Sequence, residues 1–245
     1  MNAFTNGLQV RVAAKTLEAI DICSFELVAV DGQGLPAFSA GSHVDVQVSE
    51  GVTRQYSLCN DPAESHRYVI AVLKDPNTRG GSKAMHERVQ PGDVLTISPP
   101  KNHFPLAHGA SRSLLLAGGI GVTPILCMAE RLSVLGGKFE MHYATRSRDR
   151  TAFAARIQQA PYASRVRLPP KSGALSLVEN IDKEPRDDTQ AVACAVHARV
   201  QNGGGAPGAG GSGHCRGGQG LGHTQSQPGQ LGSPVGQGRF ERGGC

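Results

Sequence analysis

Hydrophobic and polar residues follow two different periodicities along this chain, and the change falls near residue 108. Between Leu8 and about Ile97, short apolar-rich runs alternate with turn sequences such as DGQG, NDPAE and QPGD. The runs LQVRVAAKTL, CSFELVAV, HVDVQV, RQYSL, RYVIAVLK and DVLTIS predict strands of an antiparallel barrel or sandwich. SKAMHERV interrupts the series and predicts one short helix. Residues 1–107 are therefore predicted to form a β-domain.

From Ser113 the pattern becomes an alternation of strands and helices. SLLLAGGIG, KFEMHYATRS and SRVRL predict strands, while VTPILCMAERLSVLG and RTAFAARIQQA predict the helices between them. This order is typical of a parallel sheet with crossover helices. We therefore predict a second, α/β domain over residues 108–200, joined to the first near PPKNHFPLAHGA. Within its ambiguous stretch 169–190, SLVENI is a helix candidate.

Glycine is concentrated in the last part of the chain. Seventeen of the 32 glycines lie between Gly203 and Cys245, and large apolar residues are scarce beyond Asn202. Those residues are Leu221, Leu231, Val235 and Phe240. So little apolar surface does not offset a chain entropy of about 1–2 kcal/mol per residue, and residues 201–245 are predicted to be a disordered tail.

Charge and cysteine usage exclude several classes of protein. The net charge is +5, but basic residues are scattered among acidic ones, which argues against a nucleic-acid partner. No run of 18 apolar residues and no signal peptide is visible, so we predict a cytoplasmic protein without a membrane partner. The six cysteines show neither C-x-x-C nor C-x4-C-x2-C spacing. This predicts reduced structural thiols, with no metal site and no iron-sulfur cluster held by the chain.

The stretch RQYSLCND places a charge, an aromatic ring and a hydroxyl along one predicted strand. Residues two apart share a face, so Arg54, Tyr56 and Leu58 point one way while Gln55 and Ser57 point the other. An arginine and a tyrosine on one face can offer a guanidinium to a phosphate and a flat surface to a ring. A solvated arginine beside a half-buried tyrosine fits the pattern equally well.

Two glycine-rich segments stand immediately before predicted helices. In DPNTRGGSKAMHE, backbone N–H groups and the helix start can receive an anion, although a plain helix start with Ser82 as the N-cap is an alternative. In LLLAGGIGVTPIL, an apolar strand runs into Gly118-Gly119-Ile120-Gly121 and then into a helix. This turn would bring backbone close to a dinucleotide at the carboxyl end of a parallel sheet.

Taken in order, these motifs resemble the ferredoxin reductase superfamily, and more narrowly its branch of phthalate dioxygenase reductases and vanillate demethylase reductases. RQYSLCND, YVIAVLKD, TRGGSKAMHE, PPKNHFPL and LLAGGIGVTP stand where that branch has RxYSLCND, YVIAV, GRGGS, PxNxFPL and LVAGGIGITP. The match covers roughly residues 8 to 165. It implies a flavin-binding β-barrel followed by an NAD-binding α/β domain.

The resemblance also implies roles for individual residues. Arg54 would pair with the flavin phosphate, Tyr56 would lie against the ribityl chain or ring, and Ser57 would hydrogen-bond near the reactive N5. The remaining residues fall into three groups: the backbone of Ala71, Val72 and Leu73 at the ring edge; Gly80, Gly81 and Ser82 at the phosphate; and Gly118, Gly119, Thr123, Arg146 and Ser147 at the nicotinamide cofactor. Ser57 and Thr123 are the residues predicted to act in the reaction itself.

The implied reaction is hydride transfer from NADH to FMN, which depends on proximity and orientation more than on an acid or base. Electrons would then pass to a terminal oxygenase of the Rieske type, as in aromatic-ring dioxygenases or O-demethylases. His86, His103 and His142 are predicted to be structural or surface residues. NADPH is an open alternative to NADH, since Arg146 and Arg148 could meet a 2′-phosphate.

The family pattern breaks in the C-terminal part. Members continue with a Cys-Gly-Pro turn and commonly a 2Fe-2S domain, whereas this chain has QAVACAVHARVQNGGG and lacks the cluster cysteines. Cys194 stands near the expected turn without Gly-Pro and is not assigned. An out-of-frame translation starting near Thr189, or a truncation, would explain the break, and a natural disordered tail is the competing interpretation. We therefore expect flavin binding with impaired NADH oxidation. An FAD-type ferredoxin or flavodoxin reductase and a non-catalytic flavin-binding remnant are the alternatives.

Overall fold

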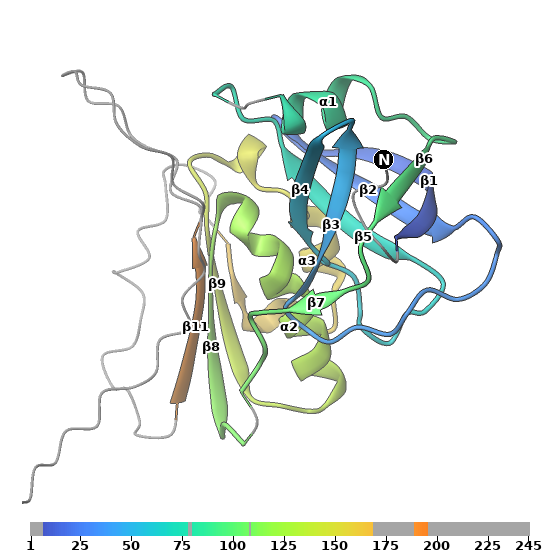
Figure 1. Ribbon diagram of the computed structural model, residues 1–245. Coiled ribbons are helices and arrows are strands. Elements are labelled where there is room, and N and C mark those ends of the chain that lie inside the picture. Colours follow the sequence, from blue (N-terminus) through green and yellow to red (C-terminus); the bar gives the residue numbers. More distant parts are fainter. Residues whose placement is uncertain (1–6, 78–79, 108, 169–188, 196–245) are drawn as a thin grey trace, which may run out of the picture.

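The computed structural model describes residues 7–77, 80–107, 109–168 and 189–195, the last of these as backbone only. Two layers of structure follow one another along the chain, an antiparallel β-domain and then a parallel sheet with helices (Figure 1). This is the fold class that the two periodicities predict.

The first domain is a sheet in the order β4-β3-β6-β1-β2-β5, with β7 pairing with β3. Its strands are β1 Leu8–Ala19, β2 Ile22–Ala29, β3 Ser42–Ser49, β4 Val52–Ser57, β5 Tyr68–Leu73, β6 Val94–Ile97 and β7 Lys101–Asn102, and its helix is α1 Gly81–Glu87. A bridge between Leu58 and Ile70 joins the end of β4 to β5 and closes the barrel. All six predicted strands are confirmed, and the two-residue β7 is additional.

The barrel interior is filled by alternate residues of the strands. Val10 and Val12 on β1 and Phe25 and Leu27 on β2 have no exposed surface, while their neighbours Gln9 and Arg11 face outward or lie partly exposed. Period-two alternation of this kind is what a half-buried strand requires.

The second domain is a parallel sheet in the order β10-β9-β8-β11. Its elements are β8 Arg112–Gly118, the 3-10 turn η1 Gly119–Gly121, α2 Val122–Val134, β9 Phe139–Ala144, the 3-10 turn η2 Arg148–Arg150, α3 Ala154–Gln159, the 3-10 turn η3 Ala163–Arg165, β10 Val166–Arg167 and β11 Thr189–Ala195. Strand β11 pairs with β8 in parallel from Thr189 to Ala195, so the stretch QAVACA does form a strand.

Two boundaries of the second domain differ from the predicted ones. The helix predicted over RTAFAARIQQA begins only at Ala154, because Phe153 adopts a left-handed backbone conformation with φ 61° that no helix continues through. The strand predicted over SRVRL is reduced to Val166–Arg167 after a 3-10 turn. SLVENI and the predicted disordered tail 201–245 lie outside the described residues. The predicted domain limit at residue 107 falls between β7 and β8.

The two domains share a continuous apolar core. Helix α2 is packed on the barrel side of the sheet (Figure 1), and its Ile125 belongs to the same cluster as Ile22, Cys59 and Ala71 of the barrel. The turn between β1 and β2 adds polar contacts, since Ile20 N donates to Asp149 O at 2.9 Å and Arg150 pairs with Asp21 at 3.1 Å. The barrel and the sheet are therefore held in a fixed relation along one face.

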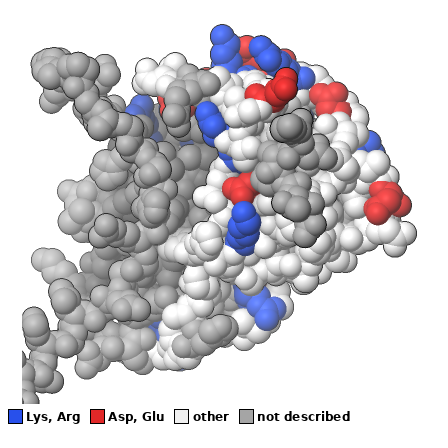
Figure 2. Space-filling view, viewed as in Figure 1, with Lys and Arg blue, Asp and Glu red and all other residues white. Residues whose placement is uncertain are grey.

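Charges of both signs are mixed on the surface. On the face shown in Figure 2, lysine and arginine side chains lie beside aspartate and glutamate side chains, including over α1. Across the described part of the chain, none of the helices has the length and apolarity needed to cross a membrane.

Candidate cofactor site

The first contact that builds the site joins β4 to α1. Arg54 on β4 lies so close to Gly81 that a Cβ atom at Gly81 would stand 2.7 Å from the Arg54 Nε and 2.8 Å from its Cγ. Arg54 also donates to the Thr53 carbonyl at 2.7 Å, and it makes no ion pair with a carboxylate among the described residues. The guanidinium and the glycine loop, which are 27 positions apart in the sequence, thus meet at one place.

Tyr56 is the second residue of this strand that bears on a ligand. Its hydroxyl is buried and has no hydrogen-bond partner among the described residues, and burial raises its pKa to about 12. A buried hydroxyl without a partner costs about 1–3 kcal/mol. An additional molecule that offers an acceptor or a donor here would remove that cost, so the position fits a polar ligand such as a ribityl chain.

Hydrogen bonds attach the C-terminal end of helix α1 to strands β1 and β5 of the barrel. Lys15 of β1 donates to the carbonyls of His86 and Val89 at 2.6 and 2.9 Å, and the His86 ring lies 2.8 Å from the Val72 carbonyl on β5. His86 is thus a structural residue, as predicted. The alternative in which Ser82 is the N-cap is wrong: the cap is Gly80, with φ 99°, and no side chain caps the helix. The Ser82 hydroxyl instead accepts a hydrogen bond from Asp75 N at 3.2 Å.

Strand β5 carries the residues predicted to line the ring edge. The side chains of Ala71 and Val72 are buried, with 4% and 1% exposure, so only their backbone is available to a ligand. The strand contacts both α1 and the turn η1 of the second domain. It therefore connects the Arg54 and Gly81 region with the glycine turn of the second domain.

The glycine turn itself leaves space beside its backbone. Gly119 has φ 53°, a conformation that favours glycine, and a Cβ atom there would meet no atom within 4 Å. Gly118 closes β8 in an extended conformation. Thr123, in the first turn of α2, is 5% exposed, and its hydroxyl donates to the Ile120 carbonyl at 3.1 Å. In this geometry Thr123 shapes the turn, and its predicted part in the reaction stays a prediction.

Arg146 and Ser147 follow β9, at the same carboxyl edge of the parallel sheet as the glycine turn. The Ser147 carbonyl accepts hydrogen bonds from the Thr145 and Thr151 hydroxyls at 3.1 and 3.0 Å. These bonds fold the segment back after the strand. The position agrees with an adenosine contact, and the role of both residues stays a prediction.

Three of the predicted groups are thus connected in space: Arg54 and Tyr56 on β4, Gly80 to Ser82 at α1, and Ala71 to Leu73 on β5. Gly118 and Gly119 adjoin them through the contact of β5 with η1. Arg146 and Ser147 lie on the second domain, directly after β9. The chemistry that this arrangement can perform is binding an anion next to a flat ring that lies against a second domain.

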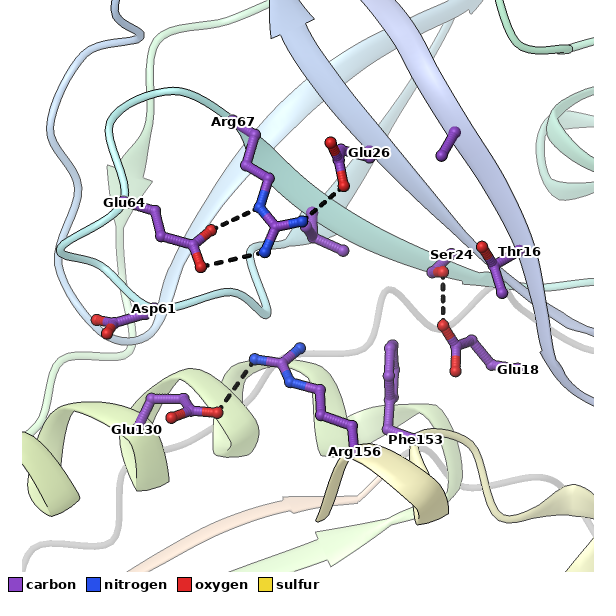
Figure 3. A pocket seen from close by; sticks show the side chains of 12 residues that line it. Thr16, Glu18, Ser24, Glu26, Asp61, Glu64, Arg67, Glu130, Phe153 and Arg156 are labelled. Atoms are coloured by element: carbon purple, nitrogen blue, oxygen red, sulfur yellow. Dashed lines mark hydrogen bonds and ion pairs between the residues drawn. The ribbon is translucent and has the colours of Figure 1, made fainter. Parts of the chain in front are cut away.

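A charged pocket that the sequence did not indicate lies between the two domains, where β1, β2 and β5 face α2 and α3 (Figure 3). Its volume is about 410 Å³. Arg67 binds Glu26 and Glu64 at 2.6 and 2.7 Å on the barrel side, and Arg156 binds Glu130 at 3.3 Å on the other side. The one sequence feature that could have indicated an ion pair here is the three-residue spacing of Glu64 and Arg67 in NDPAESHR.

Hydrogen bonds favour the charged form of one carboxyl group in this pocket, that of Glu64. Burial by itself raises the pKa of Glu64, but hydrogen bonds from Arg67 and Asn60 outweigh burial and leave the pKa below its usual range. The Asn60 side chain also accepts from Val69 N at 2.9 Å. The group therefore fixes the loop between β4 and β5, next to the candidate site.

The thiols in the described side chains are reduced and buried. Cys23, Cys59 and Cys127 are free, and burial raises the pKa of Cys59 and of Cys127 to about 12. Such thiols are structural rather than reactive. Among the described residues no group of three or more His, Cys, Asp or Glu side chains is arranged to hold a metal ion. Cys215 and Cys245 lie outside the described residues.

The fold and the position of the site define a class: the chain has the ferredoxin reductase-like fold. It matches the solved structure of phthalate dioxygenase reductase, described as a modular structure for electron transfer from pyridine nucleotides to 2Fe-2S. The TM-score is 0.72 at 37% sequence identity, and the match covers 78% of this chain and 61% of that one.

The sequence relatives indicate which branch of this fold class the chain resembles. The chain is 59% identical over 155 residues to vanillate O-demethylase oxidoreductase of Pseudomonas putida, which is 63% of this chain and 49% of the relative. It is 43% identical over 162 residues to phthalate dioxygenase reductase of Burkholderia cepacia, or 66% of this chain and 50% of that protein. No family model matches the sequence. The predicted resemblance is thereby confirmed, and the chain spans about half the length of these relatives.

Proposed function

We propose that this chain is a flavin-dependent NADH oxidoreductase that supplies electrons to the terminal component of an oxygenase or demethylase system. The observation that carries the proposal is the contact of Arg54 with Gly81, because it joins two separate sequence motifs into one anion-binding corner. Support comes from relatives named as reductase components of vanillate demethylase and phthalate dioxygenase systems.

The residues present fit a flavin mononucleotide. Arg54 would bind the phosphate together with the backbone of Gly80, Gly81 and Ser82, since a guanidinium and backbone N–H groups are strong partners for a phosphate. The unpartnered Tyr56 hydroxyl would bond to the ribityl chain, and Ser57 would contact the ring near N5. When bound, the flavin supplies the ability to accept a hydride and to release electrons singly.

NADH is proposed to bind across the glycine turn of the second domain. Gly118 and Gly119 would let the nicotinamide approach the backbone, because Gly119 presents an open face. Arg146 and Ser147 would hold the adenosine half at the carboxyl edge of the sheet. The contact of β5 with η1 brings the barrel next to the turn and supports binding of the two planar rings side by side.

The electron acceptor is proposed to be a Rieske-type terminal oxygenase or O-demethylase acting on an aromatic compound. The impaired NADH oxidation expected from the break in the family pattern near Thr189 is also part of this proposal, since QAVACAVHARVQNGGG stands where the family has a strand leading to Cys-Gly-Pro. In this proposal electrons leave the flavin directly for the oxygenase component.

The test is the flavin content and its reduction. The full chain, purified and denatured, should release FMN rather than FAD, identified by chromatography. Anaerobic titration with NADH and then NADPH, followed at the flavin absorbance band near its visible maximum, should show reduction by NADH at a rate well below that of a complete reductase. Release of FAD would favour the ferredoxin or flavodoxin reductase alternative. Flavin that no nicotinamide nucleotide reduces would favour the non-catalytic remnant, and absence of flavin binding would refute the proposal.

A further inference from the structure

A buried histidine lies beside Ser57 and takes no part in hydride transfer. His43 on β3 is the direct cross-strand partner of Ser57 on β4. Side chains of such a pair lie on the same face of the sheet, with Cβ atoms about 4.5–5.5 Å apart. His43 is only 6% exposed, and its Nε2 atom is buried without a hydrogen-bond partner among the described residues. An orphaned imidazole nitrogen next to a serine is an expensive arrangement unless another group uses it.

A second histidine connects this buried position with solvent. The ring of His103, which follows β7, lies 5.0 Å from the His43 ring between centroids, with 58° between the planes. His103 is exposed. The order Ser57, His43, His103 therefore runs from the predicted ring edge of the flavin to the surface of the barrel, through groups that each bind and release protons.

The surroundings of His43 favour the uncharged imidazole. Burial lowers its pKa, and His103 and Lys101 lower it further, whereas Asp45 on the same strand opposes them. The Asp45 carboxylate is itself bound to Lys101 at 2.7 Å, so its effect on the imidazole is partly neutralised. Ser57, Lys101 and His103 are the groups that face His43 from β4, β7 and the following loop. The balance of these effects lowers the pKa of His43 and favours the form in which one ring nitrogen can accept a proton.

We propose that His43, acting through Ser57, carries the proton that leaves the flavin when a one-electron acceptor re-oxidises it, and passes it to His103 and solvent. The inference rests on the proposed flavin site and extends it from hydride uptake to proton release. Reduced flavin that holds one hydride loses two electrons and one proton on re-oxidation. Two acceptor molecules take one electron each. The Ser57 hydroxyl receives the proton from N5 and gives its own proton to a nitrogen of His43.

The experiment separates this step from the reaction with NADH. The full chain is loaded with FMN, reduced stoichiometrically with dithionite, and mixed with ferricyanide in a stopped-flow instrument in H₂O and in D₂O at several pH values. The variants are His43→Gln, His43→Asn and Ser57→Ala. His66→Gln is the matched control, because His66 is an exposed histidine of the same barrel, in the loop before β5. FMN affinity and thermal unfolding are measured for every variant.

We expect His43→Gln and Ser57→Ala each to slow re-oxidation about 100-fold or more, in line with the usual contribution of a proton-transfer group. The double variant should be no slower than either single variant, because both act on one path. Added imidazole should restore the rate of the His43 variants, and the solvent isotope effect of the unsubstituted chain should change in them. His66→Gln should behave as the unsubstituted chain does.

Two results would overturn the inference. The first is an unchanged re-oxidation rate and isotope effect in both His43 variants. The second is a loss of re-oxidation rate that parallels the loss of FMN affinity and stability and is not restored by imidazole, which would assign His43 a packing role. Failure of NADH to reduce the flavin would refute the proposed reductase function and leave this inference standing, since dithionite replaces NADH. Failure of the unsubstituted chain to bind FMN would refute both.

Discussion

The contact between Arg54 and Gly81 leads to a quantitative prediction for Gly81→Ala. The new Cβ atom would stand 2.7 Å from the Arg54 Nε and 2.8 Å from its Cγ, whereas ordinary van der Waals contact begins near 3.4 Å. The arginine must therefore withdraw by about 0.7 Å, the difference between 3.4 and 2.7 Å. A hydrogen bond stretched from about 2.9 to about 3.6 Å is no longer a hydrogen bond.

The expected loss is that of one charge-assisted hydrogen bond to the phosphate, about 1.5–3 kcal/mol. This corresponds to an increase of about 10- to 150-fold in the Kd for FMN. Folding should not suffer, because alanine is favoured over glycine inside a helix by up to about 1 kcal/mol and Gly81 is the first residue of α1. The variant thus separates ligand binding from stability.

The assay is quenching of flavin fluorescence on titration with the full chain, using FMN and riboflavin in parallel. Riboflavin lacks the phosphate, so its Kd should hardly change in Gly81→Ala. Gly34→Ala is the control, since a Cβ atom there meets only the Ser65 carbonyl at 3.6 Å. An unchanged Kd for FMN, or equal losses for FMN and riboflavin, would refute the assignment of this corner to the phosphate.

Three further predictions concern stability and reactivity. Gly41→Ala should lower the melting temperature in calorimetry by several degrees or prevent folding. Gly41 has φ 93°, and a Cβ atom there would stand 1.9 Å from the Phe104 carbonyl oxygen. An unchanged melting temperature would contradict the close packing of this turn. Glu64→Gln should cost about 1 kcal/mol in the free energy of unfolding at neutral pH. The pKa of Glu64 is lowered in the fold, so its contribution to the free energy of unfolding is fully present above the unfolded pKa of about 4.3. This contribution disappears as the pH falls through the folded pKa. Urea titrations of both proteins should therefore converge at low pH. Cys59 and Cys127, both with 0% exposure, should resist a thiol reagent until denaturant is added, as peptide mass spectrometry will show; rapid modification of either in the native chain would contradict their burial.

The pattern of apolar residues was sufficient to predict the strands of the barrel and the alternation that follows it. Strand β7 was missed because two residues carry no periodicity, and its formation depends on pairing with β3. The helix after β9 starts later than predicted because of the left-handed Phe153, a conformation that tertiary contacts impose and no propensity indicates. Ser82 was a reasonable N-cap candidate from its type, yet the left-handed Gly80 already occupies that position.

The candidate site was predicted where motifs lie on one strand or one loop, as with Arg54 and Gly81. The contacts that bring residues of different strands together could not be predicted from the sequence. The pairing of His43 with Ser57 depends on the register of β3 against β4, and a shift of one residue would place the histidine on the other face. The pocket between the domains likewise depends on how α3 packs against the barrel.

The attachment of α1 has a consequence for how this chain could change over time. Lys15, His86 and Arg54 tie the helix to three strands of the barrel, and none of these ties reaches the second domain. If the proposed flavin site is correct, binding of the flavin and its reduction by NADH would depend on different parts of the chain. Under the proposed function, sequence changes after β8 would abolish reduction by NADH while the protein still bound the flavin and stayed yellow.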